Sequence, residues 1–374
     1  MARKLQSDKW LFLATLALVC ISIVMVYSAS AVVALERYQQ PYHFVTRQVM
    51  WAFFGLAVLS IVMRIDYRTY RNEQLIWAML GVVAVMLVAV LFSREINGSR
   101  RWFGVGGFGI QPSELAKLAA IFFAAFILDR RMHRINDLKY ALLPIALIVG
   151  GLSGLILIEP DFGTAAALSV VVAAMIVAAG LSYRYILGLA VVLLPVAYFV
   201  LASADYRWRR IVAFLNPWAD PLGDGYHIIQ SLIAVGSGGM LGRGLMGGIQ
   251  KLFYLPEPQT DFIFAVIAEE LGLLGATFVL ACFGVIAWRG LRAATSAPDK
   301  FGAFLAFGIT GMVVAQALVN LSVVLSLLPT KGIPLPLVSA GGSSLLVNLA
   351  SIGVLLNISQ HAVHDEAATE PGAA

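Results

Sequence analysis

Long apolar runs constrain this chain more than any other feature. A helix that crosses the hydrocarbon core of a bilayer needs roughly 20 apolar residues, and ten runs of about that length follow one another along the 374 residues. They are centred on residues 11–33, 45–63, 75–92, 112–128, 141–158, 164–181, 185–202, 262–288, 303–328 and 343–359. Only 13% of the residues are charged, about half the share in soluble chains, so a soluble globular enzyme is excluded. The sequence therefore predicts an all-α integral membrane protein, polytopic, with about ten transmembrane helices and a long extracytoplasmic loop, 203–261, between helices 7 and 8.

The polar stretches that flank these runs divide the chain into three parts. We expect a cytoplasmic N-terminus at 1–9, a single transmembrane domain at 10–360 and a disordered, acidic cytoplasmic tail at 361–374. Lys and Arg are more numerous on one set of alternate loops, which the positive-inside rule assigns to the cytoplasm, so both termini are predicted to be cytoplasmic. The first run is longer than the apolar core of a signal peptide and is interpreted as an uncleaved anchor. The net charge of +5 comes from short basic clusters between the runs, which are typical of topology signals, so nucleic acid is not a predicted partner.

Polar residues gather in five clusters beside the apolar runs, nearly all on the predicted extracytoplasmic side. An ionisable group in hydrocarbon costs at least ~2.5–3.5 kcal/mol, so charges retained there indicate function. The clusters contain Arg100, Arg101, Glu114 and Lys117; Asp161; Arg207 and Arg210; Asp261; and Lys331. Together they predict an outward-facing polar cavity, because non-helical backbone is tolerated at membrane depth only inside protein or around water. Its excess of positive side chains suits an anionic ligand such as a diphosphate, and apolar walls beside it suit a lipid tail.

Each cluster also has an ordinary structural interpretation. Glu114 and Lys117 are three residues apart on one helix face and fit a buried ion pair. The Arg-Trp runs fit an interfacial aromatic belt with arginines that reach lipid phosphates. Asp261 precedes an apolar run, so it or Thr260 fits the N-cap of that helix. The functional interpretation is preferred because all five clusters share one side of the membrane.

Isolated polar residues within or near the spans carry less weight. Gln316 and Asn320, four residues apart in the ninth run, are typical of hydrogen bonds between helices. His227 is a lone histidine with no second His or Cys at metal-ligand spacing, so a structural role is expected for it and no metal site is assigned.

Several sequence strings in the polar clusters carry a family resemblance. They are NGSRRW with QPSELAKL, EPDFGTA, RIVAFLNPW with DPLGDGYH, LPEPQTDFIFAVIAEELG and LPTKGIPLPLVSAGGSS. These strings resemble the SEDS family (shape, elongation, division and sporulation), membrane glycosyltransferases that polymerise peptidoglycan. The resemblance runs from about Trp10 to Gln360, and TDFIFAVIAEELG and GGSS are its most specific parts. NGSRRW, FLNPW, LPTKGIPLPLVS and the length of the loop are more similar to the cell-division branch than to the rod-elongation branch.

This resemblance implies a fold, a substrate and a set of site residues. The fold has ten helices, and the substrate is lipid II, an undecaprenyl-diphosphate-linked disaccharide pentapeptide. The aspartate of TDFIF, which is Asp261 here, is implied to be essential for polymerisation. Matching motif positions then carry roles over to Glu114, Lys117, Asp161 and Lys331.

The resemblance also implies partners and a location. The partners are a class B penicillin-binding protein with transpeptidase activity, other divisome membrane proteins and the surrounding membrane lipid. The location is the bacterial cytoplasmic (inner) membrane at the division septum. Two positions depart from the family pattern, since many relatives have His in place of Gln259 and Tyr in place of Ala340, so neither residue is assigned a role.

The chemistry of glycan extension fits these residues. The hydroxyl of an acceptor sugar attacks the anomeric carbon of a donor whose leaving group is a lipid diphosphate. A carboxylate that accepts the hydroxyl proton contributes about 10²–10⁴-fold, and fixed cations stabilise the leaving diphosphate. Our hypothesis from the sequence is that Asp261 is the general base and that Lys117 keeps it ionised. Diphosphate binding is assigned to Arg100, Arg101, Arg207, Arg210 and Lys331; a divalent cation, Mg or Mn, at the diphosphate stays open.

Three other functions also stay open from the sequence. The first is a rod-elongation polymerase of the same chemistry. The second is a lipid II flippase or ion-coupled transporter with Glu269, Glu270 and Lys117 as its relay, although transporters place their sites near the midplane and usually show repeats. The third is a non-catalytic scaffold that recruits a cell-wall transpeptidase.

Overall fold

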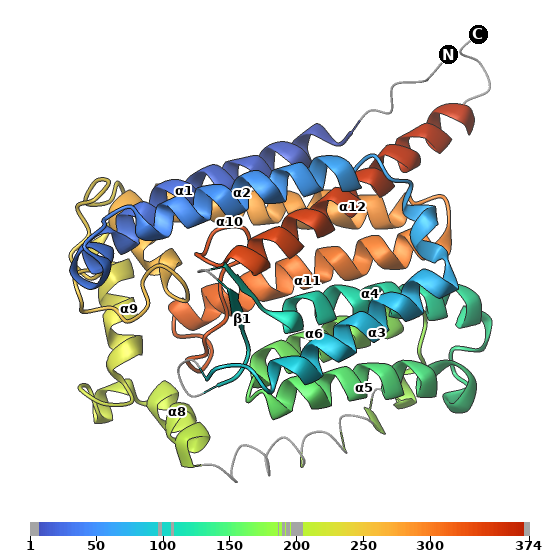
Figure 1. Cartoon of the computed structure of the whole chain (residues 1–374), viewed down its shortest axis with the longest axis horizontal. Coiled ribbons are helices and arrows are strands. Elements are labelled where there is room, and N and C mark those ends of the chain that lie inside the picture. Colours follow the sequence, from blue (N-terminus) through green and yellow to red (C-terminus); the bar gives the residue numbers. More distant parts are fainter. Residues whose placement is uncertain are drawn as a thin grey trace.

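The computed structural model describes residues 7–95, 99–105, 108–185, 187, 188, 191, 195 and 205–369. Its long helices are α1 (Lys9–Tyr38), α2 (His43–Val62), α3 (Glu73–Val90), α4 (Pro112–Arg131), α5 (Leu143–Ile158), α6 (Phe162–Ala178), α10 (Ile263–Thr295), α11 (Lys300–Val324) and α12 (Gly342–Thr369). Its shorter elements are η1 (Tyr67–Arg71), β1 (Phe103–Val105), β2 (Phe108–Ile110), η2 (Met132–Arg134), η3 (Leu138–Leu142), α8 (Asp205–Leu215), η4 (Pro217–Ala219) and α9 (Tyr226–Ser237). The long helices form one bundle, and α8 and α9 lie beside one end of it (Figure 1).

Most of the predicted spans correspond to helices of the bundle. Seven described helices are long and apolar enough to cross a membrane: α1, α2, α3, η3 with α5, α10, α11 and α12. The predicted spans 112–128 and 164–181 correspond to α4, which is more polar, and to α6, which is shorter. The predicted span 185–202 lies largely outside the described residues.

Short polar side chains define where several helices begin. Asp8 accepts hydrogen bonds from the backbone N–H groups of Trp10 and Leu11, at 3.1 Å each, and so caps α1. Asn72 caps α3 and Asp299 caps α11 in the same way. These side chains satisfy N–H groups that have no partner inside the helix, which explains why the helices start at these positions.

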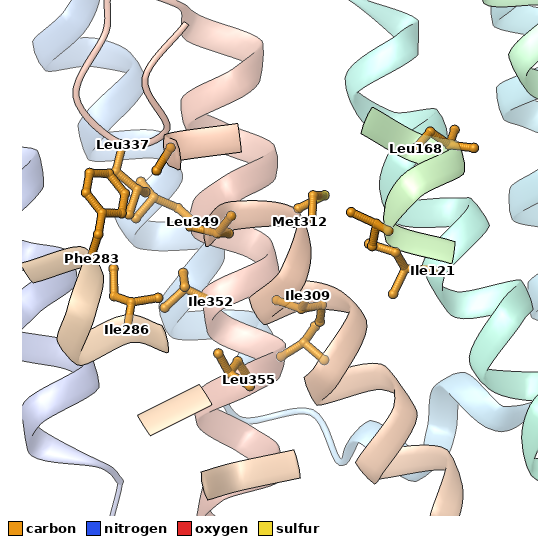
Figure 2. Close-up of a cluster of buried hydrophobic side chains, with 14 of the residues drawn as sticks. Ile121, Leu168, Phe283, Ile286, Ile309, Met312, Leu337, Leu349, Ile352 and Leu355 are labelled. Carbon is orange, nitrogen blue, oxygen red and sulfur yellow. The ribbon is translucent and has the colours of Figure 1, made fainter. Parts of the chain in front are cut away.

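The bundle is centred on α4, which is buried on nearly every side. Its middle is rich in alanine, and small side chains allow neighbouring helices to approach closely where lipid supplies no hydrophobic driving force. The buried alanines are Ala116, Ala119, Ala120, Ala124 and Ala125. Helices α3, α6 and α11 pack around α4, while α12 packs against α2 and α10 against α11. Figure 2 shows part of the resulting apolar core, with Ile121 and Leu168 on one side of α11 and Phe283 and Ile286 on the other.

The two ends of the bundle differ in their connections. The beginning of α1 and the end of α12 lie at the same end (Figure 1), where Gln360 Nε2 donates a 2.7 Å hydrogen bond to Ser7 Oγ. The opposite end carries α9, the loop from α9 to α10, and the segment 325–341 between α11 and α12. The polar clusters of the sequence, apart from Arg207 and Arg210 on α8, gather toward this second end.

Two local features differ from the sequence expectation. A two-stranded antiparallel hairpin, with Phe103 opposite Ile110, joins α3 to α4, where no strand was predicted. Helix α12 continues to Thr369, through a stretch where the sequence predicted a disordered tail at 361–374. Alanine and glutamate in HAVHDEAAT favour helix, which explains the continuation; residues 370–374 lie outside the described part of the chain.

Candidate functional site

Asp261 lies at the end of the long loop, two residues before α10 begins. The side-chain amide of Asn320, from α11, donates hydrogen bonds to the backbone carbonyls of Asp261 (2.8 Å) and Ile333 (2.7 Å). The hydroxyl of Ser339 donates to the carbonyl of Thr260 at 2.5 Å. Three separate parts of the chain therefore fix the backbone at Asp261: the loop itself, α11 and the segment 325–341.

The Asp261 carboxylate is partly buried against that same segment. Gly332 approaches it so closely that a Cβ added there would stand 2.7 Å from Asp261 Oδ2. Burial, and secondarily the negative charge of Glu257, raise the pKa of Asp261 to about 6. Both causes disfavour the ionised form. This direction is opposite to the sequence hypothesis, in which Lys117 kept the carboxylate ionised.

Lys117 forms an ion pair with Glu114 and a hydrogen bond with Gln316. Its ammonium lies 2.9 Å from Glu114 Oε1 and donates a 2.8 Å hydrogen bond to Gln316 Oε1, and all three side chains are buried. The amide nitrogen of Gln316 donates in turn to the carbonyl of Pro334 at 3.1 Å. The ion-pair interpretation of Glu114 and Lys117 is therefore confirmed, and the pair also braces the segment that lies against Asp261.

Lys331 and Asp161 both lie at the start of α6. The carboxylate of Asp161 caps this helix by accepting from the backbone N–H (3.2 Å) and the hydroxyl (2.7 Å) of Thr164. It also accepts a 3.3 Å hydrogen bond from Gln111, the residue before α4. The Lys331 ammonium lies 4.3 Å from the centre of the Phe162 ring, within the range of a cation–π contact. Since Lys331 adjoins Gly332, this corner of the bundle is next to Asp261.

The turn between α5 and α6 binds one of the predicted arginines. Arg101 donates to the backbone carbonyls of Glu159 (3.0 Å) and Pro160 (2.5 Å). The side chain of Glu159 is fully buried, and neither carboxylate oxygen has a hydrogen-bond partner among the described residues. Burial and the charge of Asp161 raise the pKa of Glu159 to about 8, against an opposing effect of Arg101. Glu159 is therefore mainly neutral at pH 7.

The remaining predicted cations are Arg100, Arg207 and Arg210. Arg100 is exposed and donates to the carbonyl of Leu91 at 3.1 Å. Arg210 is exposed on α8, and burial together with its charge lowers the pKa of His227 on α9. The His227 ring stacks on Phe262, beside Asp261, with 6.2 Å between ring centres. The side chain of Arg207 lies outside the described residues.

Comparison with known proteins decides the family. A family model described as cell cycle protein, which covers FtsW, RodA and SpoVE, matches residues 9–364. This chain belongs to the SEDS family. The family assignment from the sequence strings is thereby confirmed.

Close relatives carry two kinds of name. A protein of Geobacter metallireducens named probable peptidoglycan glycosyltransferase FtsW is 44% identical over 94% of this chain and 94% of its own length. Stage V sporulation protein E of Bacillus subtilis is 43% identical over 96% of this chain and 98% of its own length. At 43–44% identity, this chain is more similar in sequence to these two relatives than to the solved RodA structure, which is 28% identical.

Solved SEDS structures share the fold. A chain from work on the coordination of polymerization and crosslinking by a peptidoglycan synthase complex superposes with a TM-score of 0.79, at 32% identity, over 96% of this chain and 99% of that one. The crystal structure of RodA from Thermus thermophilus superposes with a TM-score of 0.70, at 28% identity, over 95% and 97%. The all-α, polytopic membrane fold predicted from the sequence is confirmed by these likenesses.

Sequence reasoning missed the residues that hold the site together. Gln316 and Asn320 were both interpreted as hydrogen bonds between helices. Gln316 does join α11 to α4 through Lys117, whereas Asn320 bonds the backbone carbonyls of Asp261 and Ile333, which lie outside the helices. Their spacing of four residues within an apolar span was the available signal, since it places both amides on one face of α11. Among the described residues, no three His, Cys, Asp or Glu side chains are grouped as a metal site requires. A divalent cation there would depend on substrate phosphates for further ligands.

Proposed function

We propose that this SEDS protein is a septal peptidoglycan glycosyltransferase that polymerises lipid II into glycan strands, with Asp261 as the general base. The observation that carries the proposal is the environment of Asp261. Its carboxylate is partly buried, and hydrogen bonds from Asn320 and Ser339 fix the backbone at Asp261 and Thr260. The pKa of this carboxylate is raised to about 6. A general base works best when its pKa lies near the operating pH, because it is then both ionised and able to accept a proton. At pH 7 such a carboxylate is mostly ionised and is a stronger base than an ordinary aspartate.

The surroundings of Asp261 supply acceptors for sugar hydroxyls. Gln259 Oε1 and Asn320 Oδ1 are buried and have no hydrogen-bond partner among the described residues. Gln259 is two residues from Asp261, and Asn320 is bonded to the Asp261 carbonyl. A buried acceptor without a partner costs about 1–3 kcal/mol, and a hydroxyl-rich ligand removes that cost. The proposed acceptor sugar would donate to these atoms while Asp261 accepts the proton of the attacking hydroxyl.

Arg101 and Lys331 suit the leaving diphosphate. Arg101 is bonded to neutral backbone carbonyls, so its positive charge is not cancelled by those contacts. Lys331 lies over the ring of Phe162, one residue from the glycine that touches Asp261. Lys117 is neutralised by Glu114, so we propose that this pair positions the site and does not bind diphosphate directly. Fixed positive charge at a developing anion is among the largest catalytic effects known.

Membership of the family supports a partner and a location for this chain. We propose that a class B penicillin-binding protein crosslinks the strands that this chain makes, with other divisome proteins in the same assembly. Support comes from the structural relative whose complex joins polymerization to crosslinking. We propose the cytoplasmic membrane at the septum as the location, with both termini in the cytoplasm, which agrees with the start of α1 and the end of α12 lying at one end of the bundle.

Polymerisation of purified lipid II tests the base assignment. The full chain, reconstituted with its transpeptidase partner, is compared with Asp261→Asn, and glycan strands are separated on a gel. We expect Asp261→Asn to lower the rate by at least about 10²-fold, the usual contribution of a general base. The matched control is Asp224→Asn, an exposed carboxylate 3.8 Å from Arg209, which should leave the rate unchanged. A wild-type rate for Asp261→Asn would refute the proposal.

A further inference from the structure

Helix α10 is interrupted nine residues after it begins, and the long loop occupies the interruption. Gly272 has φ +65° and ψ −162°, values outside the helical region. The backbone groups that lose their helical partners bond to the loop instead. These four hydrogen bonds run from Leu273 N–H to Gly239 O (2.9 Å), Leu274 N–H to Met240 O (3.3 Å), Arg243 N–H to Glu269 O (3.0 Å) and Gly244 N–H to Glu270 O (3.0 Å).

The two carboxylates just before the interruption bind the next part of the loop. Glu269 accepts hydrogen bonds from the backbone N–H groups of Ile249 (2.8 Å) and Gln250 (3.2 and 3.3 Å). Glu270 accepts one from the N–H of Met246 (3.0 Å). Both glutamates are buried. They therefore hold the loop, and these contacts occupy the groups that a transporter would need as a proton relay.

A buried ion pair completes this attachment. The ammonium of Lys251 lies 2.5 Å from Glu270 Oε1 and donates a 2.8 Å hydrogen bond to the hydroxyl of Ser28 on α1. The Ser28 hydroxyl lies 2.7 Å from each oxygen of Glu270. All three side chains are at most 3% exposed. We call Ser28, Lys251 and Glu270 the loop anchor.

Asp261 lies in the chain segment between the two charged residues of the loop anchor. Lys251 and Glu270 are 19 residues apart in the chain, and Asp261 lies near the middle of the segment between them. One end of this segment is tied to α10 by the ion pair, and the other end is α10 itself. A closed segment of this kind restricts where its middle can lie.

We propose that Lys251 and Glu270, braced by Ser28, are positioning residues that set the place of the Asp261 carboxylate against its substrate. The inference rests on the proposed function, since it concerns the same carboxylate. The anchor's side chains bond to one another and to the backbone N–H of Met246, so the anchor acts on Asp261 through the backbone of the loop. Misplacing a catalytic group by about 1 Å lowers a rate by about 10²-fold, so a loosened anchor lowers kcat more than it raises KM.

Paired substitutions separate positioning from folding. Lys251→Met alone leaves a buried, unpaired carboxylate and is expected to lower the unfolding temperature strongly, whereas replacing both partners of a buried pair is often neutral. The informative protein is therefore the double variant Lys251→Met with Glu270→Gln, compared with wild type for lipid II polymerisation by the full chain with its transpeptidase partner. The control pair is Arg130→Met with Glu73→Gln, an ion pair of 2.7 Å that is half exposed and joins the start of α3 to the end of α4.

We expect the anchor double variant to fold, to lose at least about tenfold in kcat and to keep KM within about twofold. Its backbone amides in 246–261 should exchange hydrogen faster than in wild type, and the control pair should change none of these. Wild-type kcat and wild-type exchange in the double variant overturn the proposal.

A second variant, Ser28→Ala, serves if the double variant fails to fold, because it removes one hydroxyl and keeps the ion pair. We expect a smaller loss of kcat with faster hydrogen exchange in 246–261, and no change in either overturns the proposal. Failure of the base assignment is seen separately, as a wild-type rate for Asp261→Asn, while the exchange measurement still reports on the anchor.

Discussion

The side chain of Asn320 ties α11 to the backbone of Asp261 through a 2.8 Å hydrogen bond to the Asp261 carbonyl. The same amide nitrogen donates to the carbonyl of Ile333 at 2.7 Å. One buried side chain thus joins the loop before α10 to the segment after α11. The consequence is that the proposed base and the segment carrying Lys331 keep a fixed separation.

Replacing Asn320 with leucine is expected to lower activity as well as stability. Asn320→Leu removes both hydrogen bonds and leaves two buried carbonyls without a donor, at about 1–3 kcal/mol each. Because those carbonyls belong to Asp261 and Ile333, the base moves relative to the diphosphate site. We expect kcat for lipid II polymerisation to fall at least about tenfold, with a smaller change in KM.

A second asparagine gives a matched control for that prediction. Asn357 also bridges two parts of the chain, since it donates to the carbonyl of Met63 (2.9 Å) and accepts from the N–H of Tyr67 (2.9 Å). It lies on α12 at the end of the bundle opposite Asp261. Asn357→Leu should lower the unfolding temperature by a similar amount and leave the rate per folded molecule within about twofold. Equal rates for the two variants would contradict a specific role for Asn320.

The pH dependence of polymerisation should report the titration of Asp261. The ionised form is the base, so kcat/KM falls as the pH is lowered through a pKa of about 6. Glu257→Gln removes the negative charge that contributes to this raised pKa. The acid limb should then move to lower pH, because the carboxylate ionises more easily without that neighbour.

The comparison variant for the pH profile is Asp224→Asn. This carboxylate is on the loop, but its nearest ion-pair partner is Arg209 at 3.8 Å and both side chains are substantially exposed. Its removal should leave the acid limb where it is in wild type. A limb that stays near pH 6 in Glu257→Gln, or moves upward, would show that Glu257 does not act on the group being titrated.

The sequence predicted the spans better than the site, for a physical reason. A run of about 20 apolar residues is a local property, so α1, α3, α11 and α12 can be recognised without knowing their neighbours. The hydrogen bond from Asn320 to Asp261 joins residues 59 positions apart, and nothing in either local stretch specifies the other. The sequence indicated that polar groups would share one end of the molecule, but not which cation would pair with which carboxylate.

The interruption of α10 illustrates the same limit. The run 262–288 was predicted as one span because its hydropathy is continuous, and a glycine inside an apolar run does not by itself reveal a positive φ. Glu269 and Glu270 then fitted a transport relay. In the structure the loop fills the break at Gly272, and the two glutamates hold that loop. Only the partner segment explains why two acids are kept in an apolar run.

Two glycines of the loop should differ sharply in their tolerance of alanine. Both have positive φ, +79° at Gly242 and +87° at Gly244, so alanine at either costs roughly 1–2 kcal/mol in backbone strain. At Gly242 an added Cβ would also collide with the backbone carbonyl of Glu270, whereas at Gly244 it would meet open space. Gly242→Ala should therefore lower the unfolding temperature more and reduce polymerisation, while Gly244→Ala should keep most activity. Similar losses in both variants would count against the packing of the loop on α10.

Glu159 should make the protein less stable as the pH rises. Its pKa is about 8 in the folded protein against 4.5 ordinarily, so the folded state binds the proton more tightly. That contribution to stability is complete below about pH 4.5 and is lost as the pH rises through 8. Glu159→Gln has no proton to lose. Its unfolding temperature, measured from pH 5 to pH 9, should rise relative to wild type by at least about 2 °C.

The control for this stability series is Glu73→Gln, a half-exposed carboxylate paired with Arg130. Its unfolding temperature should stay parallel to that of wild type over the same pH range, because an exposed pair contributes little. Parallel curves for Glu159→Gln as well would mean that the buried carboxylate is ionised at neutral pH. In that case Arg101, which already bonds the carbonyl of Glu159, would be its counter-ion and would be less available to a diphosphate.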